Sequence, residues 1–284
     1  MDVPALPPLL AAVLAAPQLG LTLALGAAVG VIMALTGAGG GILAVPLLVF
    51  GLHLPLQQAA PTGLIAVGTA AALAAVLGLR EGIVRYRAAG FMSAFGMATA
   101  PAGVWLAARL PAVPMLLGFS GLLLWVAWRS LRAAPPGDAA PPEHLPCRLD
   151  PAQGRLRWTG RCARALGATG LTSGLLSGLF GVGGGFVIIP ALQHVSNLDL
   201  RSIQATSLAV IALVSASGVV AASASGALPW AVAIPFGAGA VVALLAARVL
   251  ARRLHPGHLR RAFGLLTLVV ALMMIARAFG WRIG

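Results

Sequence analysis

The stretch GAGGGILAVP at residues 37–46 occurs again, in altered form, as GVGGGFVIIP at residues 181–190. Both follow the pattern GxGGGxxxxP, and each leads into an apolar segment of only about 12 residues, which is too short to span a bilayer as an ordinary helix. Glycine is a poor helix former, so a cluster of four within five residues predicts an unwound backbone. We therefore expect each stretch to produce a broken helix followed by a short one.

The two stretches are separated by 144 positions, and the same ungapped offset aligns much of the chain. It places Gly26 on Gly170 and Thr62 on Thr206, for example. A constant offset over so many positions indicates an internal repeat. The predicted units are a first transmembrane repeat, a Pro- and Arg-rich linker and a second transmembrane repeat, at residues 18–131, 132–160 and 161–284.

The composition is that of an integral membrane protein. Of the 284 residues, 60% are hydrophobic and 9% are charged, and the mean hydropathy is +0.97. A soluble domain is nearer 45–50% apolar and about 25% charged. Five apolar segments in each repeat predict an all-α fold of two repeats of about five membrane helices each, with no room for a soluble catalytic domain. The segments are residues 19–36, 42–54, 59–79, 88–108, 113–131, 162–180, 186–196, 203–223, 230–250 and 257–279.

The distribution of arginine predicts the orientation of the chain. The net charge is +13, and all 19 basic residues are arginines, which cluster at the ends of the apolar segments rather than in a nucleic-acid-binding patch. If both short segments cross the membrane, each repeat has five crossings and the second is inverted, with 16 arginines on one side and 3 on the other. If they only dip in and return, the counts are 12 and 7. The positive-inside rule favours the inverted repeat, with the linker cytoplasmic and both termini outside.

The glycine runs are candidates for an anion site. A helix that restarts after unwound backbone directs free N–H groups and the positive end of its dipole toward the gap. Such irregular backbone is tolerated inside a membrane only where it is buried or lines a cavity. The alternative is that the glycines serve helix packing, which is what we expect of the four-residue spacing of Gly26 and Gly30 and of Gly170, Gly174 and Gly178. A nucleotide-binding loop is excluded, because no strand precedes either run.

Polar residues near the start of the third segment of each repeat form a second candidate group. Neutral hydroxyl and amide groups can replace part of the hydration shell of an oxyanion. The alternative is that they cap their own helices or bond to neighbouring carbonyls. Together with the glycine runs, they give a predicted binding site of Gly39, Gly40, Gly41, Gln58, Thr62, Gly183, Gly184, Gly185, Gln204, Thr206 and Ser207.

Several kinds of chemistry lack the residues they require. None of the six acidic residues lies in the middle of a predicted span, so a carboxylate proton relay or sodium cage is not expected, and no metal or cofactor is implied. His53 and His194, at the ends of the short segments, are expected to be interfacial. Cys147 and Cys162 have no partner at metal-binding spacing, and neither a metal site nor a disulfide is predicted there. The turn-forming stretch 150–154 predicts a small hairpin in the linker.

The doubled GxGGGxxxxP, together with the Ala-Thr-Ser-Leu helix start at residues 205–208, resembles the TauE/SafE family of sulfite and sulfonate exporters. The resemblance implies a bacterial cytoplasmic-membrane transporter that exports sulfur-containing anions such as sulfite or sulfoacetate. In the first repeat Gly63 stands where the pattern has a serine, so the two repeats contribute unequally. The alternatives are an importer of the same or other small anions and a membrane accessory subunit without transport activity. A homodimer is compatible with the sequence, but no feature demands one.

Overall fold

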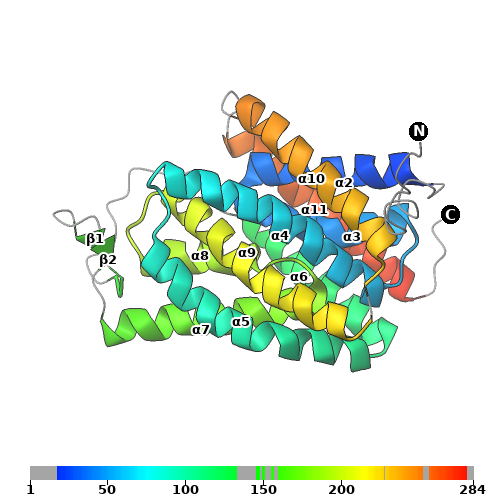
Figure 1. Cartoon of the computed structure of the whole chain (residues 1–284), viewed down its shortest axis with the longest axis horizontal. Coiled ribbons are helices and arrows are strands. Elements are labelled where there is room, and N and C mark those ends of the chain that lie inside the picture. The colour runs from blue at the N-terminus through cyan, green and yellow to red at the C-terminus, as the bar shows by residue number, and fades with distance from the viewer. Residues whose placement is uncertain are drawn as a thin grey trace, which may run out of the picture.

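The computed structural model describes residues 18–132, 145–147, 149–150, 155–156, 159–226, 228–251 and 256–279. This part of the chain is almost wholly helical, which confirms the predicted all-α class (Figure 1). The part of the chain predicted as the first repeat contains α2 (Leu19–Thr36), the 3₁₀ helix η1 (Gly37–Leu43), α3 (Ala44–Gly51), α4 (Leu56–Arg80), α5 (Tyr86–Arg109) and α6 (Ala112–Arg132). The second contains α7 (Gly160–Phe180), α8 (Gly185–Val195), α9 (Leu200–Ala224), α10 (Trp230–Ala251) and α11 (Pro256–Ala278).

The helices are those of a multi-pass membrane protein. Seven of the described helices are long and apolar enough to cross a bilayer, namely α2, α4, α5, α6, α9, α10 and α11. The two short apolar helices α3 and α8 follow the glycine runs, as the sequence predicted. α7 is long enough at 21 residues but is less apolar, because Arg161, Arg164 and a series of glycines and hydroxyl residues interrupt it.

Helices from the two repeats interleave. α4 and α9 pack against each other near the middle of the bundle, with α2 and α10 along one side and α5 and α7 along the opposite side (Figure 1). α6 packs against α11. The main partner of α2 is therefore α10 of the other repeat, and the main partner of α7 is α5 of the other repeat.

Glycines bring these interleaved pairs together. A side chain on Gly26 would collide with the backbone of Phe236, and one on Gly170 with that of Met92. Gly30, Gly174 and Gly178 likewise face the backbone of the partner helix, so the predicted packing role of these glycines is confirmed. The offset of 144 relates Gly26 to Gly170 and Met92 to Phe236, and the two contacts are therefore equivalents under the repeat.

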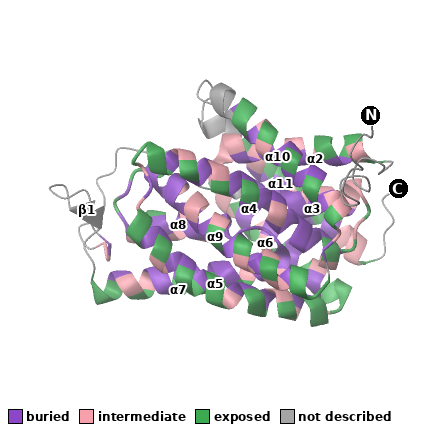
Figure 2. Ribbon diagram, in the orientation of Figure 1, coloured by how far each residue is buried: buried purple, intermediate pink, exposed green. Residues whose placement is uncertain are grey.

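The outer surface of the bundle suits a lipid environment. Buried residues gather along the faces that α4, α8 and α9 turn inward, and exposed residues lie on the outer faces (Figure 2). Large apolar side chains are exposed there, including Val220 at 70% and Leu272 at 56%. Arg109 stacks on Trp105 near one helix end and Arg132 on Trp128 near another, which is an arrangement typical of the membrane–water interface.

The bundle has two distinct ends. At one, α2 begins and α11 ends (Figure 1). There the guanidinium of Arg277 donates to the carbonyl of Val49 in α3 (3.3 Å). We call this the terminal end. The other, the linker end, is marked by the strands β1 (Leu149–Asp150) and β2 (Arg155–Leu156), which pair in antiparallel fashion. The predicted linker hairpin is thus confirmed.

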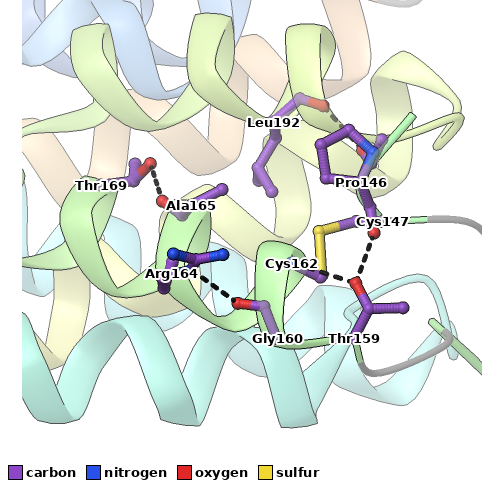
Figure 3. Close-up of a disulfide and its surroundings, with 10 residues drawn as sticks. Pro146, Cys147, Thr159, Gly160, Cys162, Arg164, Ala165, Thr169 and Leu192 are labelled. Carbon is purple, nitrogen blue, oxygen red and sulfur yellow. Dashed lines mark hydrogen bonds between the residues drawn. A yellow bond between two sulfur atoms is a disulfide. The ribbon is translucent and has the colours of Figure 1, made fainter. Parts of the chain in front are cut away.

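The prediction that Cys147 and Cys162 form no disulfide is wrong. They are bonded to each other, with Cα atoms 4.9 Å apart (Figure 3). Thr159 caps α7 by accepting a hydrogen bond from the N–H of Cys162 (3.1 Å) and donates to the carbonyl of Pro146 (3.0 Å). The N–H of Cys147 in turn donates to the carbonyl of Val195 at the end of α8 (2.9 Å). These contacts fold the linker back onto the first turn of α7, a closure that cysteine spacing alone does not indicate.

Candidate functional site

The two glycine runs adopt different backbones, although we expected both to be unwound. Residues 37–43 form the 3₁₀ helix η1, which continues into α3. Residues 181–184 are not helical, and Gly181, Gly183 and Gly184 have φ values of +74°, +72° and +74°. Only glycine adopts this left-handed region without strain. The first run is broken as well, because Gly37 has a φ of +74° and ends α2. The expectation of broken helices is therefore confirmed for both runs, whereas the expectation of an unwound backbone holds only for the second.

Both runs reach the same place between α4 and α9. A side chain on Gly41 would lie 2.9 Å from Cγ1 of Val67 and 3.3 Å from the carbonyl oxygen of Val182. One on Gly183 would lie 2.8 Å from the same Val67 methyl group and 2.8 Å from Cγ2 of Ile211. Val67 and Ile211 are near the middles of α4 and α9, so the runs converge at the centre of the bundle. The absence of side chains on these glycines permits the close approach.

The start of α8 presents free hydrogen-bond donors. Gly184 is the N-cap residue and offers no side-chain cap, so the first N–H groups of α8 have no partner within the helix. The carbonyl of Gly184 already accepts from the N–H groups of Val187 (3.0 Å) and Ile188 (3.2 Å). The hydroxyl of Ser173 on α7 lies 3.5 Å from that carbonyl. The helix dipole adds positive potential at this point, which favours an anion.

Of the predicted residues of the first repeat, Gly41 reaches the meeting point, whereas the side chains of Gln58 and Thr62 are directed elsewhere. Gln58 lies in the first turn of α4 with its side chain exposed. The hydroxyl of Thr62 is buried and donates to the carbonyl of Gln58 (2.8 Å), which is the ordinary bond of a helical threonine to the preceding turn. Gly39 and Gly40 lie in η1, and a side chain on Gly40 would collide with the backbone of α2.

The predicted residues of the second repeat make more contacts with the rest of the bundle. The amide of Gln204 covers Gly37, since a side chain on that glycine would lie 3.0 Å from Gln204 Nε2. Thr206 accepts a hydrogen bond from the backbone N–H of Arg85 (3.0 Å), so it links the start of α9 to the loop between α4 and α5. Gly185 is the first residue of α8 and is buried. The hydroxyl of Ser207 is buried and has no hydrogen-bond partner among the described residues.

Three serines near the second glycine run were not predicted. Ser173 and Ser177 lie one turn apart on α7, and Ser215 lies on α9. The hydroxyl of Ser215 is 3.7 Å from the point that a side chain on Gly183 would occupy. The sequence does contain a signal, because Ser207, Ile211 and Ser215 follow one another at four-residue spacing and so share a helix face.

The linker end carries charged groups at the start of α9 and the end of α8. Asp199 caps α9 by accepting a hydrogen bond from the N–H of Ser202 (3.1 Å). Burial acts to raise the pKa of the Asp199 carboxyl, but hydrogen bonds from Ser202 and from its own N–H, with the positive charge of Arg85, hold that pKa below its usual value. His194 at the end of α8 lies 3.1 Å from the guanidinium of Arg129 on α6. This contact holds the end of α8 against α6.

The chain is similar in sequence to one known protein family and to two proteins described as membrane transporters. The profile of the family described as "Sulfite exporter TauE/SafE" matches residues 22–274. A "Probable membrane transporter protein" of Xylella fastidiosa strain Temecula1 is 29% identical over 262 residues, which cover 91% of this chain and 95% of that protein. A protein of the same description from strain 9a5c is 27% identical with the same coverage. No solved structure is significantly similar to this chain.

Proposed function

We propose, from the premise that this chain belongs to the TauE/SafE family of sulfite exporters, that it carries small sulfur-containing anions such as sulfite or sulfoacetate out of the cell. The chain is a membrane transporter and not an enzyme. What the proposal adds is the substrate class, the outward direction and the cytoplasmic membrane as the location. It also assigns the substrate to the meeting point of the two glycine runs.

The observation that carries this proposal is the convergence of Gly41 and Gly183 on Val67. The meeting point lies at the centre of the bundle, where a transporter fold commonly holds its substrate between repeats. The free N–H groups at the start of α8 supply donors there, and no carboxylate of the described spans lies beside them to repel an anion. An oxyanion, which only accepts hydrogen bonds, is the ligand that such a set of donors suits.

Alternating access follows from the proposed inverted repeat. Two observations support a mechanism in which two related halves rock about the central site. The interleaved contacts recur at the offset of 144, and the terminal and linker ends lie at opposite ends of the bundle. With the linker cytoplasmic, an inside-negative membrane potential drives each negative charge outward with about 2.3 kcal/mol per 100 mV. Export then requires no separate coupling ion.

The test is a flux assay with purified protein in liposomes under an imposed potassium diffusion potential. Sulfite or sulfoacetate should move toward the positive compartment without a proton gradient, whereas phosphate and choline should not move. Flux that depends on a proton gradient, or that runs only inward in cells, would refute potential-driven export. A protein that moves no sulfur anion at all would instead be an accessory subunit.

A further inference from the structure

Most hydroxyl side chains in these helices bond to a carbonyl of the preceding turn. Thr62, Ser120 and Thr267 are buried examples, with distances of 2.8, 2.7 and 2.7 Å. Such bonds are the usual way to satisfy a serine or threonine in a membrane helix. Among the described residues, four completely buried serines depart from this rule and have no hydrogen-bond partner: Ser93, Ser177, Ser207 and Ser215.

One of these four serines borders the second glycine run directly. The hydroxyl of Ser215 lies 3.7 Å from the point that a side chain on Gly183 would occupy. Ile211, one turn earlier on the same face of α9, also contacts Gly183. Ser215 therefore belongs to the surface of α9 that faces the run.

A second unpartnered serine lies on α7. Ser177 is one turn beyond Ser173, whose hydroxyl touches Gly184, and the two lie on the same helix face. The carbonyl of Ser177 accepts the N–H of Gly181 (2.8 Å), which is the last bond of α7 before the run. Hydroxyl-bearing faces of α7 and α9 thus flank the second run, next to the free N–H groups at the start of α8.

The first repeat has one unpartnered buried serine, Ser93 on α5, but no hydroxyl at the positions equivalent to those of the second repeat. At the offset of 144, the counterparts of Ser177, Ser207 and Ser215 are Met33, Gly63 and Ala71, and all three are buried. The two glycine runs therefore meet at the same place in the bundle, but the serine hydroxyls of the second repeat have no equivalent in the first.

We infer that Ser177 and Ser215 are the side-chain donors of a one-sided oxyanion site at the start of α8. The first glycine run closes this site as an apolar wall and supplies no second set of donors. This inference rests on the proposed function and adds to it which repeat binds the substrate. The carbonyl of Gly184 already accepts from Val187, Ile188 and Ser173, whereas the first N–H groups of α8 have no cap, so the site suits an anion rather than a metal cation.

Because these hydroxyls are unpaired, the inference predicts an unusual combination of effects on stability and on ligand binding. A buried hydroxyl without a partner destabilises the protein, so its removal should leave the ligand-free protein as stable or more stable. The same removal deletes a hydrogen bond to a charged ligand, and each lost bond should weaken binding about tenfold or more. A serine with a purely structural role would not combine these two effects.

The experiment compares S177A, S215A and the double variant with wild type in detergent or nanodiscs. Thermal unfolding without ligand and calorimetric binding of sulfite and sulfoacetate are the two measurements. S120A is the matched control, because Ser120 is equally buried but bonds to Leu116 (2.7 Å) on α6. A71S places a hydroxyl at the position equivalent to Ser215 in the first repeat. We expect both controls to keep wild-type affinity.

Two negative results are distinguishable. If wild type binds sulfite and the serine variants bind it equally well, or if A71S strengthens binding as much as S215A weakens it, the one-sided site is wrong while the proposed function stands. If wild type binds and transports neither sulfur anion, the proposed function fails and this inference fails with it.

Discussion

The meeting of both glycine runs at Val67 predicts that one glycine substitution can be rescued and the other cannot. A methyl group on Gly41 would lie 2.9 and 3.0 Å from the two methyl carbons of Val67. A methyl group on Gly183 would lie 2.8 Å from one of them and also 2.8 Å from Ile211. Gly183 has a φ of +72° in addition, whereas Gly41 does not have a positive φ. V67A should therefore relieve G41A more completely than G183A.

The magnitudes follow from the same contacts. Overpacking of this kind costs about 1–3 kcal/mol, and a left-handed alanine at position 183 adds about 1–2 kcal/mol. V67A removes two buried methyl groups and should cost about 2 kcal/mol alone. In the G41A/V67A double variant the new methyl group occupies part of the vacated space, so the combined loss should fall short of the sum by about 1–3 kcal/mol. In G183A/V67A the contact with Ile211 and the strained φ persist.

The assay is denaturant unfolding of the purified protein in detergent, followed by tryptophan fluorescence, for the full double-mutant cycle. The control cycle pairs G41A with V126A, since Val126 is a largely buried valine on α6 and is not in contact with Gly41. It should be additive. Additivity within about 0.5 kcal/mol for G41A with V67A would refute the convergence of the glycine runs and with it the central site.

Three further predictions test orientation and the linker end. Gly82 and Gly226 are equivalents at the offset of 144, share a φ of +69° and have open space for a side chain. In a background that lacks the native cysteines, G82C should react with a membrane-impermeant thiol reagent only from the cytoplasm and G226C only from outside. The reverse pattern would contradict the proposed orientation. The Cys147–Cys162 disulfide of the structure is typical of an oxidising compartment, whereas the proposed cytoplasmic linker lies in a reducing one. The proposed orientation therefore predicts that both residues are thiols in rapidly quenched cells and form the disulfide, which stabilises by about 3 kcal/mol, only after oxidation; an intact disulfide in cells would place the linker outside. The pKa of Asp199 is lower in the folded than in the unfolded protein, so its contribution to stability is present above about pH 4 and is lost as the pH falls through the folded value; D199N, which keeps the helix cap, should lose less stability than wild type between pH 6 and pH 3, and equal losses would rule out this role.

The positions of the helices could be predicted from the sequence because hydrophobic segments and helix-breaking residues are local signals. The predicted segment 186–196 corresponds to α8 (Gly185–Val195), and the linker hairpin follows from its turn residues. The segment 42–54 is divided instead between η1 and α3, since helix type in a glycine run depends on what packs against it. The disulfide was missed for a related reason: it depends on Thr159 and the end of α8 bringing distant segments together.

The directions of the side chains in the site were harder to predict from the sequence than the positions of the helices. Gln58 and Thr62 lie one turn apart on α4, yet Gln58 is exposed while Thr62 is buried, although Leu56 and Ala59 in the same first turn are buried. The motif residue Thr206 bonds to the Arg85 backbone, which points to a role in holding the loop between α4 and α5 to α9. A residue type repeated in both halves therefore does not fix a shared function, since each copy meets different neighbours.

The offset of 144 preserves the packing glycines better than the residues around the proposed site. Gly26 and Gly170 make equivalent contacts, whereas Met33 and Ser177, or Ala71 and Ser215, differ completely in hydrogen-bonding capacity. A symmetric backbone is what two related halves need in order to exchange conformations about a shared centre. A single small anion at that centre, however, meets both halves at once, and a hydroxyl that one repeat supplies need not be supplied by the other. The asymmetry of the serines is thus compatible with a symmetric transport cycle, and it concentrates the effect of substitutions in α7 and α9.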